Sequence, residues 1–180
     1  MELIYVGGTT NGKLSFASPL AYLTTGELTN ASQLNIDGGG TVTQIACSLN
    51  STSINVPLGD VLDIKFTGVG VTTGDKGFNV GLTCDKDAKI NVSLAGTQNS
   101  EASDTSVLAL TNAGQTGTAT GVGVQLLYGD VPLKINNNIL LKTSPGGQET
   151  LPFTARYYQT NKQVTAGKAN SSATLNITYQ

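Results

Sequence analysis

The side chains that could do chemistry in this sequence are two cysteines and a set of scattered acids. Cys47 and Cys84 are the only cysteines, and the 180-residue chain contains no histidine. Without histidine, Ser-His-Asp and Cys-His catalysis are excluded within the chain. A zinc site needs about four nitrogen or sulfur ligands, and two cysteines cannot supply them.

The acids that a glycosidase-type carboxylate pair would need lie in predicted turns and at predicted strand ends. They are Asp60, Asp63, Asp85, Asp87, Glu101 and Asp104. Such positions indicate solvated side chains. The triplet Asp85-Lys86-Asp87 lacks the remainder of a calcium-binding EF-hand loop. The sequence therefore predicts a protein that is not an enzyme and has no metal and no cofactor.

The sequence context of the two cysteines indicates that they form a disulfide. Both fall in segments that favour β-strands, and the chain is rich in Thr, Ser, Asn and Gly, as extracellular proteins often are. In an oxidising compartment they would pair and close a loop of about 37 residues, which stabilises a fold by roughly 3–4 kcal/mol. The alternative is two buried free thiols in a reducing compartment.

Charge and hydropathy exclude two further classes of function. Only 12% of the residues are charged and the net charge is −2, so there is no basic surface for nucleic acid. No apolar stretch is long enough for a transmembrane helix. The first eight residues lack the pattern of a signal peptide. We interpret Met1 as an artificial start or a truncation point, with any signal lying upstream.

Short runs of β-forming residues recur about every ten residues, separated by Gly, Asn, Asp and Pro, and this spacing predicts a β-sandwich or barrel. Four runs alternate apolar and polar residues clearly, as half-buried antiparallel strands do. The predicted strands are Glu2–Val6, Leu14–Leu23, Thr41–Leu49, Ser53–Leu58, Lys76–Cys84, Lys89–Ala95, Val122–Tyr128, Ile139–Lys142, Leu151–Gln159 and Thr174–Tyr179.

The densest glycine run, Asp37-Gly38-Gly39-Gly40, predicts a flexible connection. Residues before it hold two or three strands, too few for a stable domain. We therefore expect 1–40 to be the tail of another domain plus a linker, and 41–180, about 140 residues, to form one domain of the size of a sandwich.

The last predicted strand runs to the end of the chain. Ala173, Leu175, Ile177 and Tyr179 alternate with polar residues almost as far as Gln180. A strand at a sheet edge presents unpaired N–H and C=O groups that can pair with another chain. An ordinary last strand packed on its own domain fits the pattern equally well.

Taken together, the order and spacing of several segments resemble the pilus subunits of the chaperone–usher pathway, over about 41–180. The penultimate residue is aromatic, and a glycine lies fourteenth from the C-terminus. The matching residues are Tyr179, Gly167, the Cys47-Ser48-Leu49 strand with the following Ile54–Val61 element, Cys84 at the spacing of the disulfide partner, Thr120–Leu126 and Phe153–Tyr157.

The resemblance implies an all-β, incomplete immunoglobulin-like sandwich that lacks its final strand and is completed by a donor strand in trans. It also implies a groove along the last strand, marked by Gly167, Ala173, Leu175, Ile177 and Tyr179. A periplasmic chaperone would fill this groove and bind the carboxylate of Gln180. An outer-membrane usher would then pass the subunit to its neighbour, whose N-terminal strand replaces the chaperone's.

The N-terminal part favours a tip adhesin. Pro19 interrupts the one alternating stretch before the linker and cannot donate a ladder hydrogen bond, so no convincing donor strand precedes Cys47. Residues 2–23 resemble instead the closing strands of an adhesin's receptor-binding domain. A host receptor, expected to be a glycan, would bind a domain mostly absent here. The alternatives are an adaptor or shaft subunit and a free-standing extracellular immunoglobulin-like module. We expect a protein that passes through the periplasm into an extracellular fimbria, at its tip.

Overall fold

The computed structural model describes residues 12–13, 21–25, 28–34, 41–42 and 45–179. The chain divides into two compact units, residues 1–44 and residues 45–180. In the first unit, β1 (Gly12–Lys13) pairs with β4 (Thr41–Val42), and β2 (Ala21–Thr25) pairs with β3 (Leu28–Leu34). The predicted strand Glu2–Val6 and most of Leu14–Leu23 lie outside the described residues.

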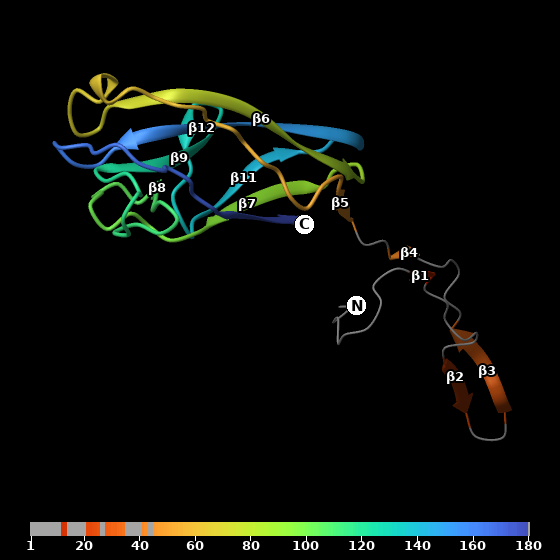
Figure 1. Ribbon diagram of the computed structural model, residues 1–180. Coiled ribbons are helices and arrows are strands. Elements are labelled where there is room, and N and C mark those ends of the chain that lie inside the picture. Colours follow the sequence, from red (N-terminus) through yellow and green to blue (C-terminus); the bar gives the residue numbers. More distant parts are fainter. Residues whose placement is uncertain (1–11, 14–20, 26–27, 35–40, 43–44, 180) are drawn as a thin grey trace. The chain divides into compact units, whose positions relative to one another are not determined.

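The second unit consists of two antiparallel sheets (Figure 1). The larger sheet contains, in spatial order, β10 (Val131–Pro132), β9 (Val122–Tyr128), β12 (Gly147–Gln159), β6 (Thr72–Cys84) and β5 (Cys47–Leu49), with β8 (Val107–Leu108) also paired to β9. The smaller sheet contains β11 (Asn138–Thr143), β7 (Lys89–Ala95) and β13 (Thr174–Tyr179). The one helical turn among the described residues is η1 (Asp63–Lys65).

The centre of the larger sheet is the long ladder between β6 and β12. The two strands run antiparallel, and Phe78 lies opposite Phe153. The register shifts next to Gly74, whose φ is +76°. Glycine adopts this left-handed conformation without steric cost, and a bulge at such a residue bends the strand and increases its twist.

The core lies between the two sheets and uses the apolar faces that the sequence predicts. The inward residues of β7 and β12 are buried, and Phe153 stacks on Phe78 with ring centroids 5.7 Å apart. The buried members of these two faces are Ile90, Val92, Leu94, Leu151, Phe153, Ala155 and Tyr157. The prediction of an all-β sandwich is therefore confirmed. No helix in the described part of the chain is long and apolar enough to cross a membrane.

The predicted strand Ser53–Leu58 is wrong. This segment joins no ladder in the described structure, although its apolar residues alternate. Alternation shows which side chains face a core, whereas a strand also needs a neighbour to pair with. The predicted strand Thr41–Leu49 corresponds to two short strands, β4 and β5. Sequence reasoning missed β1, β3, β8 and β10. Three of these, β1, β8 and β10, hold two residues each, too few to show a period.

Candidate functional site

A long groove of about 1320 Å³ opens along one side of the second unit. Two chain segments form its walls, residues 51–62 on one side and residues 164–177 on the other. The inward faces of β6, β9 and β12 form the floor. The floor residues are Phe78, Val80, Val122, Val124, Leu126, Ala155 and Tyr157, with Leu108 and Ala119 beside them.

The first wall begins where the chain leaves the edge of β6. The N–H of Asn50 donates to the carbonyl of Gly81 at 3.0 Å, and this is the last backbone bond of the β5–β6 pairing. From residue 51 to residue 61, no backbone–backbone hydrogen bond joins this segment to any other described residue. Val56, Leu58 and Val61 are only half-buried, and of these Leu58 and Val61 pack against the core. The backbone groups of residues 51–61 are thus not paired with any other described backbone, and the Gly59 carbonyl accepts, among the described groups, only the hydroxyl of Tyr157.

The second wall includes the C-terminal strand. Within the described structure, β13 pairs with β7 alone, with Leu175 opposite Leu94 and Ile177 opposite Val92. Leu175 and Ile177 line the groove and are only half-buried, whereas their partners on β7 are almost fully buried. Their inner faces therefore remain uncovered although they belong to a well-formed strand.

The shape and lining of the groove suit an extended polypeptide. A strand lying in the groove would find unpaired backbone groups on both sides and apolar side chains beneath it. In recognition by strand addition, main-chain hydrogen bonds give affinity and side-chain pockets give specificity.

Most of the groove residues that the sequence predicts lie at the groove. Gly167, Ala173, Leu175 and Ile177 line it. Tyr179 pairs with Ile90 at the end of β13 and is 38% exposed. Gln180 lies outside the described residues.

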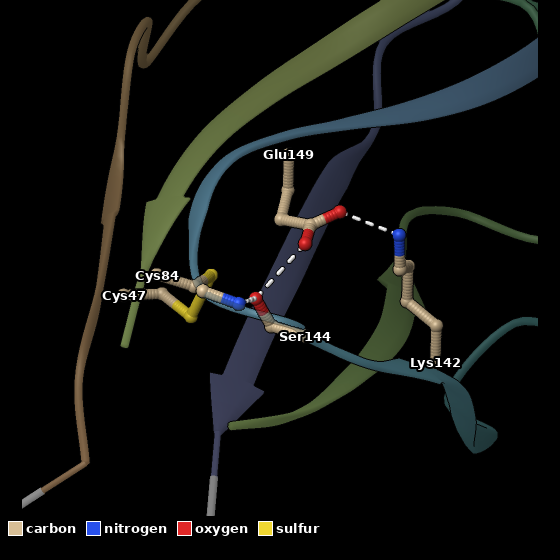
Figure 2. Close-up of polar contacts among 6 residues, drawn as sticks. Cys47, Cys84, Lys142, Ser144 and Glu149 are labelled. Atoms are coloured by element: carbon tan, nitrogen blue, oxygen red, sulfur yellow. Dashed lines mark hydrogen bonds and ion pairs between the residues drawn. A yellow bond between two sulfur atoms is a disulfide. The ribbon is translucent and has the colours of Figure 1, made fainter. Parts of the chain in front are cut away.

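The two cysteines form a disulfide, Cys47–Cys84 (Figure 2). They are directly opposite each other in the β5–β6 pairing. Next to them, the backbone N–H of Ala46 donates to the Asp85 carboxylate at 2.9 Å. The covalent bond therefore fixes the edge strand from which the first wall departs.

An ion pair links the two sheets near the turn between β11 and β12. Lys142, on β11, binds the buried Glu149, on β12, and the Ser144 hydroxyl donates to the same carboxylate at 2.9 Å (Figure 2). Both hydrogen bonds hold the pKa of Glu149 below its ordinary value of 4.5, and the bond from Lys142 lowers it most. Sequence patterns did not predict this ion pair, because the two residues belong to different sheets.

Tyr157 links the groove floor to the first wall. Its hydroxyl donates to the carbonyl of Gly59 at 3.4 Å. Burial raises the pKa of the phenol, and the Asp60 carboxylate adds to this effect. Tyr157 therefore remains neutral at physiological pH, which suits an apolar floor.

Two of the other candidate acids, Asp104 and Glu101, hold hydrogen bonds within the fold. Asp104 accepts hydrogen bonds from the N–H and the hydroxyl of Ser106, at 2.9 and 2.7 Å. Glu101 accepts one from the hydroxyl of Thr160 at 3.0 Å. In the part of the chain that the structure describes, no three acids or cysteines gather into a set that could hold a metal ion.

A structural comparison identifies the fold. A chain from a solved chaperone–usher pilus superposes with a TM-score of 0.63, over 86% of this chain and 100% of that chain, at 18% identity. Two antiparallel sheets with a disulfide and almost no helix, together with this likeness, define the pilin fold of chaperone–usher pili. The predicted fold class is confirmed.

Sequence comparisons define the family. A family model described as Fimbrial protein matches residues 36–180, so the chain belongs to the fimbrial protein family. The S-fimbrial protein subunit SfaA of Escherichia coli O6:K15:H31 is 34% identical over 182 residues, covering 93% of this chain and 99% of that protein. The fimbria adhesin protein of Klebsiella pneumoniae is 28% identical over 188 residues, covering 99% of this chain and 59% of that protein.

Proposed function

We propose that this fimbrial subunit is assembled by donor-strand complementation, with a strand from another chain filling the groove. One observation carries the proposal. The groove lies between two segments, 51–61 and β13, that each have an unpaired backbone edge in the described structure, over an apolar floor.

The energetics of such a complex follow from the groove. Covering the half-buried Leu175 and Ile177 removes apolar surface from water, worth up to about 1.5–3 kcal/mol for a side chain that becomes fully buried. Each new backbone hydrogen bond adds a net contribution of about 0.5–1.5 kcal/mol. A donor strand would therefore stabilise the subunit substantially, and an empty groove leaves it prone to aggregation.

The groove would have two occupants in succession. A periplasmic chaperone would lend a strand first and bind the C-terminal carboxylate of Gln180. At the outer-membrane usher, the N-terminal strand of a neighbouring subunit would replace it. No catalytic chemistry is needed beyond oxidation of Cys47 and Cys84, and the finished fibre lies outside the cell.

Two roles within the fibre have support. The 28% match to a fimbria adhesin protein, which covers 59% of that relative, favours the pilin domain of a tip adhesin. In that role a receptor, expected to be a glycan, would bind a preceding domain, and 1–40 would be that domain's tail and linker. The 34% match over 99% of a fimbrial subunit favours a shaft or adaptor subunit.

Expression in the periplasm of the full chain, with and without its pilus chaperone, tests strand complementation. We expect a soluble complex with the chaperone and aggregation or degradation without it. A soluble monomer that unfolds in two states without any partner would overturn the proposal and favour a free-standing immunoglobulin-like module.

The number of copies per fibre separates the two roles. Quantitative mass spectrometry of purified fimbriae would find about one copy per fibre for a tip adhesin and many for a shaft subunit. Labelling with antibody at fibre ends alone, or along the whole length, gives the same distinction independently.

A further inference from the structure

The part of the second wall that precedes β13, residues 164–173, forms its hydrogen bonds with a different neighbour than β13 does. Within the described structure, residues 164–173 form no ladder with β7. Their hydrogen bonds go instead to a loop between β8 and β9, residues 109–120. These bonds are Thr111 N to Asn170 O (2.7 Å), Ser171 Oγ to Ala109 O (2.7 Å), Ala119 N to Lys168 O (3.1 Å), Lys168 N to Gly117 O (2.8 Å), Thr165 N to Thr120 O (3.2 Å) and Thr120 N to Thr165 Oγ1 (3.2 Å).

We infer that this loop, residues 109–120, is a rim clamp that positions the upstream half of the groove wall and so sets how strongly that half holds a donor strand. The inference rests on the proposed function. Thr120 and Thr165 are its positioning residues, because their hydroxyls bond to each other at 2.8 Å across the two segments. Neither hydroxyl faces a cofactor or a reacting group. Their effect on the donor acts through the wall.

Gly167 supports the clamp. A Cβ atom at this position would lie 2.4 Å from the nitrogen of Ala119 and 2.5 Å from the carbonyl carbon of Thr118. Real Cβ atoms essentially never approach backbone atoms so closely. The absence of a side chain therefore lets the wall and the clamp pack backbone against backbone.

The clamp is separable from the core. Thr120 and Thr165 are exposed, whereas the wall residues Val164 and Ala169 are half-buried. Thr165 lies at the rim of the groove lining and Thr120 lies outside it. Replacing the two hydroxyls by methyl groups removes polar contacts at the rim and leaves the apolar floor intact. The loss is therefore expected in donor binding more than in the sandwich itself.

The experiment uses fimbriae assembled by cells that express the full chain with its chaperone and usher, with the neighbouring subunit as the donor. The variants are T120V with T165V, the conservative pair T120S with T165S, and the control T116V, an exposed threonine of the same loop whose hydroxyl has no hydrogen bond among the described residues. Two quantities are measured, the rate at which fimbriae dissociate in guanidinium and hydrogen exchange in 164–171.

We expect the valine pair to dissociate roughly five- to a hundredfold faster, as expected for two lost hydrogen bonds, the one from Thr120 N to Thr165 Oγ1 and the one between the two hydroxyls. Exchange should rise in 164–171 and not in the β12 core, 151–159. The serine pair and T116V should behave as wild type. If the wild type and the valine pair had equal dissociation rates and equal exchange, the clamp would be overturned and the proposed function would stand. The same conclusion would follow if exchange rose as much in 151–159 as in 164–171. Failure of the wild-type chain to enter fimbriae or to bind chaperone would overturn the proposed function and the clamp with it.

Discussion

At the scale of single residues, the surroundings of Gly167 and of the Lys142–Glu149 pair explain why these residue types stand at these positions. Position 167 requires a glycine because two backbone segments approach closely there, and a Cβ atom would lie 2.4 Å from the nitrogen of Ala119. Glu149 owes its lowered pKa to a lysine and a hydroxyl supplied by the other side of a turn. Both arrangements depend on segments that meet only in the folded chain.

Substituting alanine for Gly167 should displace the groove wall. Backbone atoms have to move, and overpacking of this kind typically costs about 1–3 kcal/mol. We expect the amount of chain that co-purifies with the chaperone to fall. The matched control is Gly77→Ala, since a Cβ there would meet no atom closer than 4.0 Å. Equal recovery of both variants would contradict the close approach.

Substituting methionine for Lys142 should change how stability depends on pH. Because the folded-state pKa of Glu149 is lowered, its stabilising effect is present above the ordinary value of 4.5 and is lost as pH falls through the folded-state value. The difference in free energy of unfolding between wild type and Lys142→Met, both held in complex with the chaperone, should therefore be largest near neutrality and shrink in acid. Denaturant titrations at several pH values measure it, and a pH-independent difference would argue against the ion pair.

Some of these residues could be predicted from the sequence and others could not. The pairing of Cys47 with Cys84 followed from composition and strand placement, and Gly167 from resemblance. The pairs Lys142–Glu149 and Thr120–Thr165 carry no local signal, because each joins segments whose contact is decided by the packing of the whole domain.

At the scale of elements, β13 and residues 51–62 define the groove. The alternation in β13 correctly predicted a strand over Thr174–Tyr179. The same kind of alternation in Ser53–Leu58 predicted a strand that the described structure lacks. The physical difference is a partner, since β13 has β7 beside it and the other segment has no described neighbour to pair with.

A charge placed on the groove side of β13 should abolish strand binding. Ile177 lines the groove, so Ile177→Asp would place a carboxylate under the donor strand without a partner. Thr178→Asp is the matched control, because that side chain alternates to the exposed side. We expect loss of the chaperone complex for the first variant and its retention for the second. Tyr179→Asp, at the end of the same strand, should also impair capture.

At the scale of the whole molecule, the second unit is a sandwich with a disulfide at one sheet edge and an open groove along one side. The disulfide fixes β5 to β6, the ion pair joins the two sheets at a turn, and the groove lies between two unpaired segments. Sequence patterns predicted a β-sandwich or barrel and most strands of this unit, and the family resemblance implied the two-sheet sandwich. They did not predict the lengths of the groove walls, which depend on how the loops between strands pack.

Removing the disulfide tests how much it contributes to the free energy of unfolding. The Cys47→Ser, Cys84→Ser pair should lose roughly 3–4 kcal/mol of stability, because the unfolded chain regains the freedom of a loop of about 37 residues. Denaturation of the chaperone-bound subunit, oxidised and fully reduced, measures the same quantity without mutation. A difference below about 1 kcal/mol would show that β5 is held by other contacts.

Hydrogen exchange of residues 51–61 in assembled fimbriae tests most directly whether the fold is completed from another chain. These residues have no backbone partner in the described structure, so their amides should exchange as fast as those of Gly114 and Thr116, two unbonded amides of the exposed loop 112–117, unless a donor strand covers them. We predict that in the fibre the amides of 51–61 and of β13 are strongly protected, while those of Gly114 and Thr116 exchange rapidly. Equally rapid exchange in 51–61 and at those two amides would contradict strand complementation.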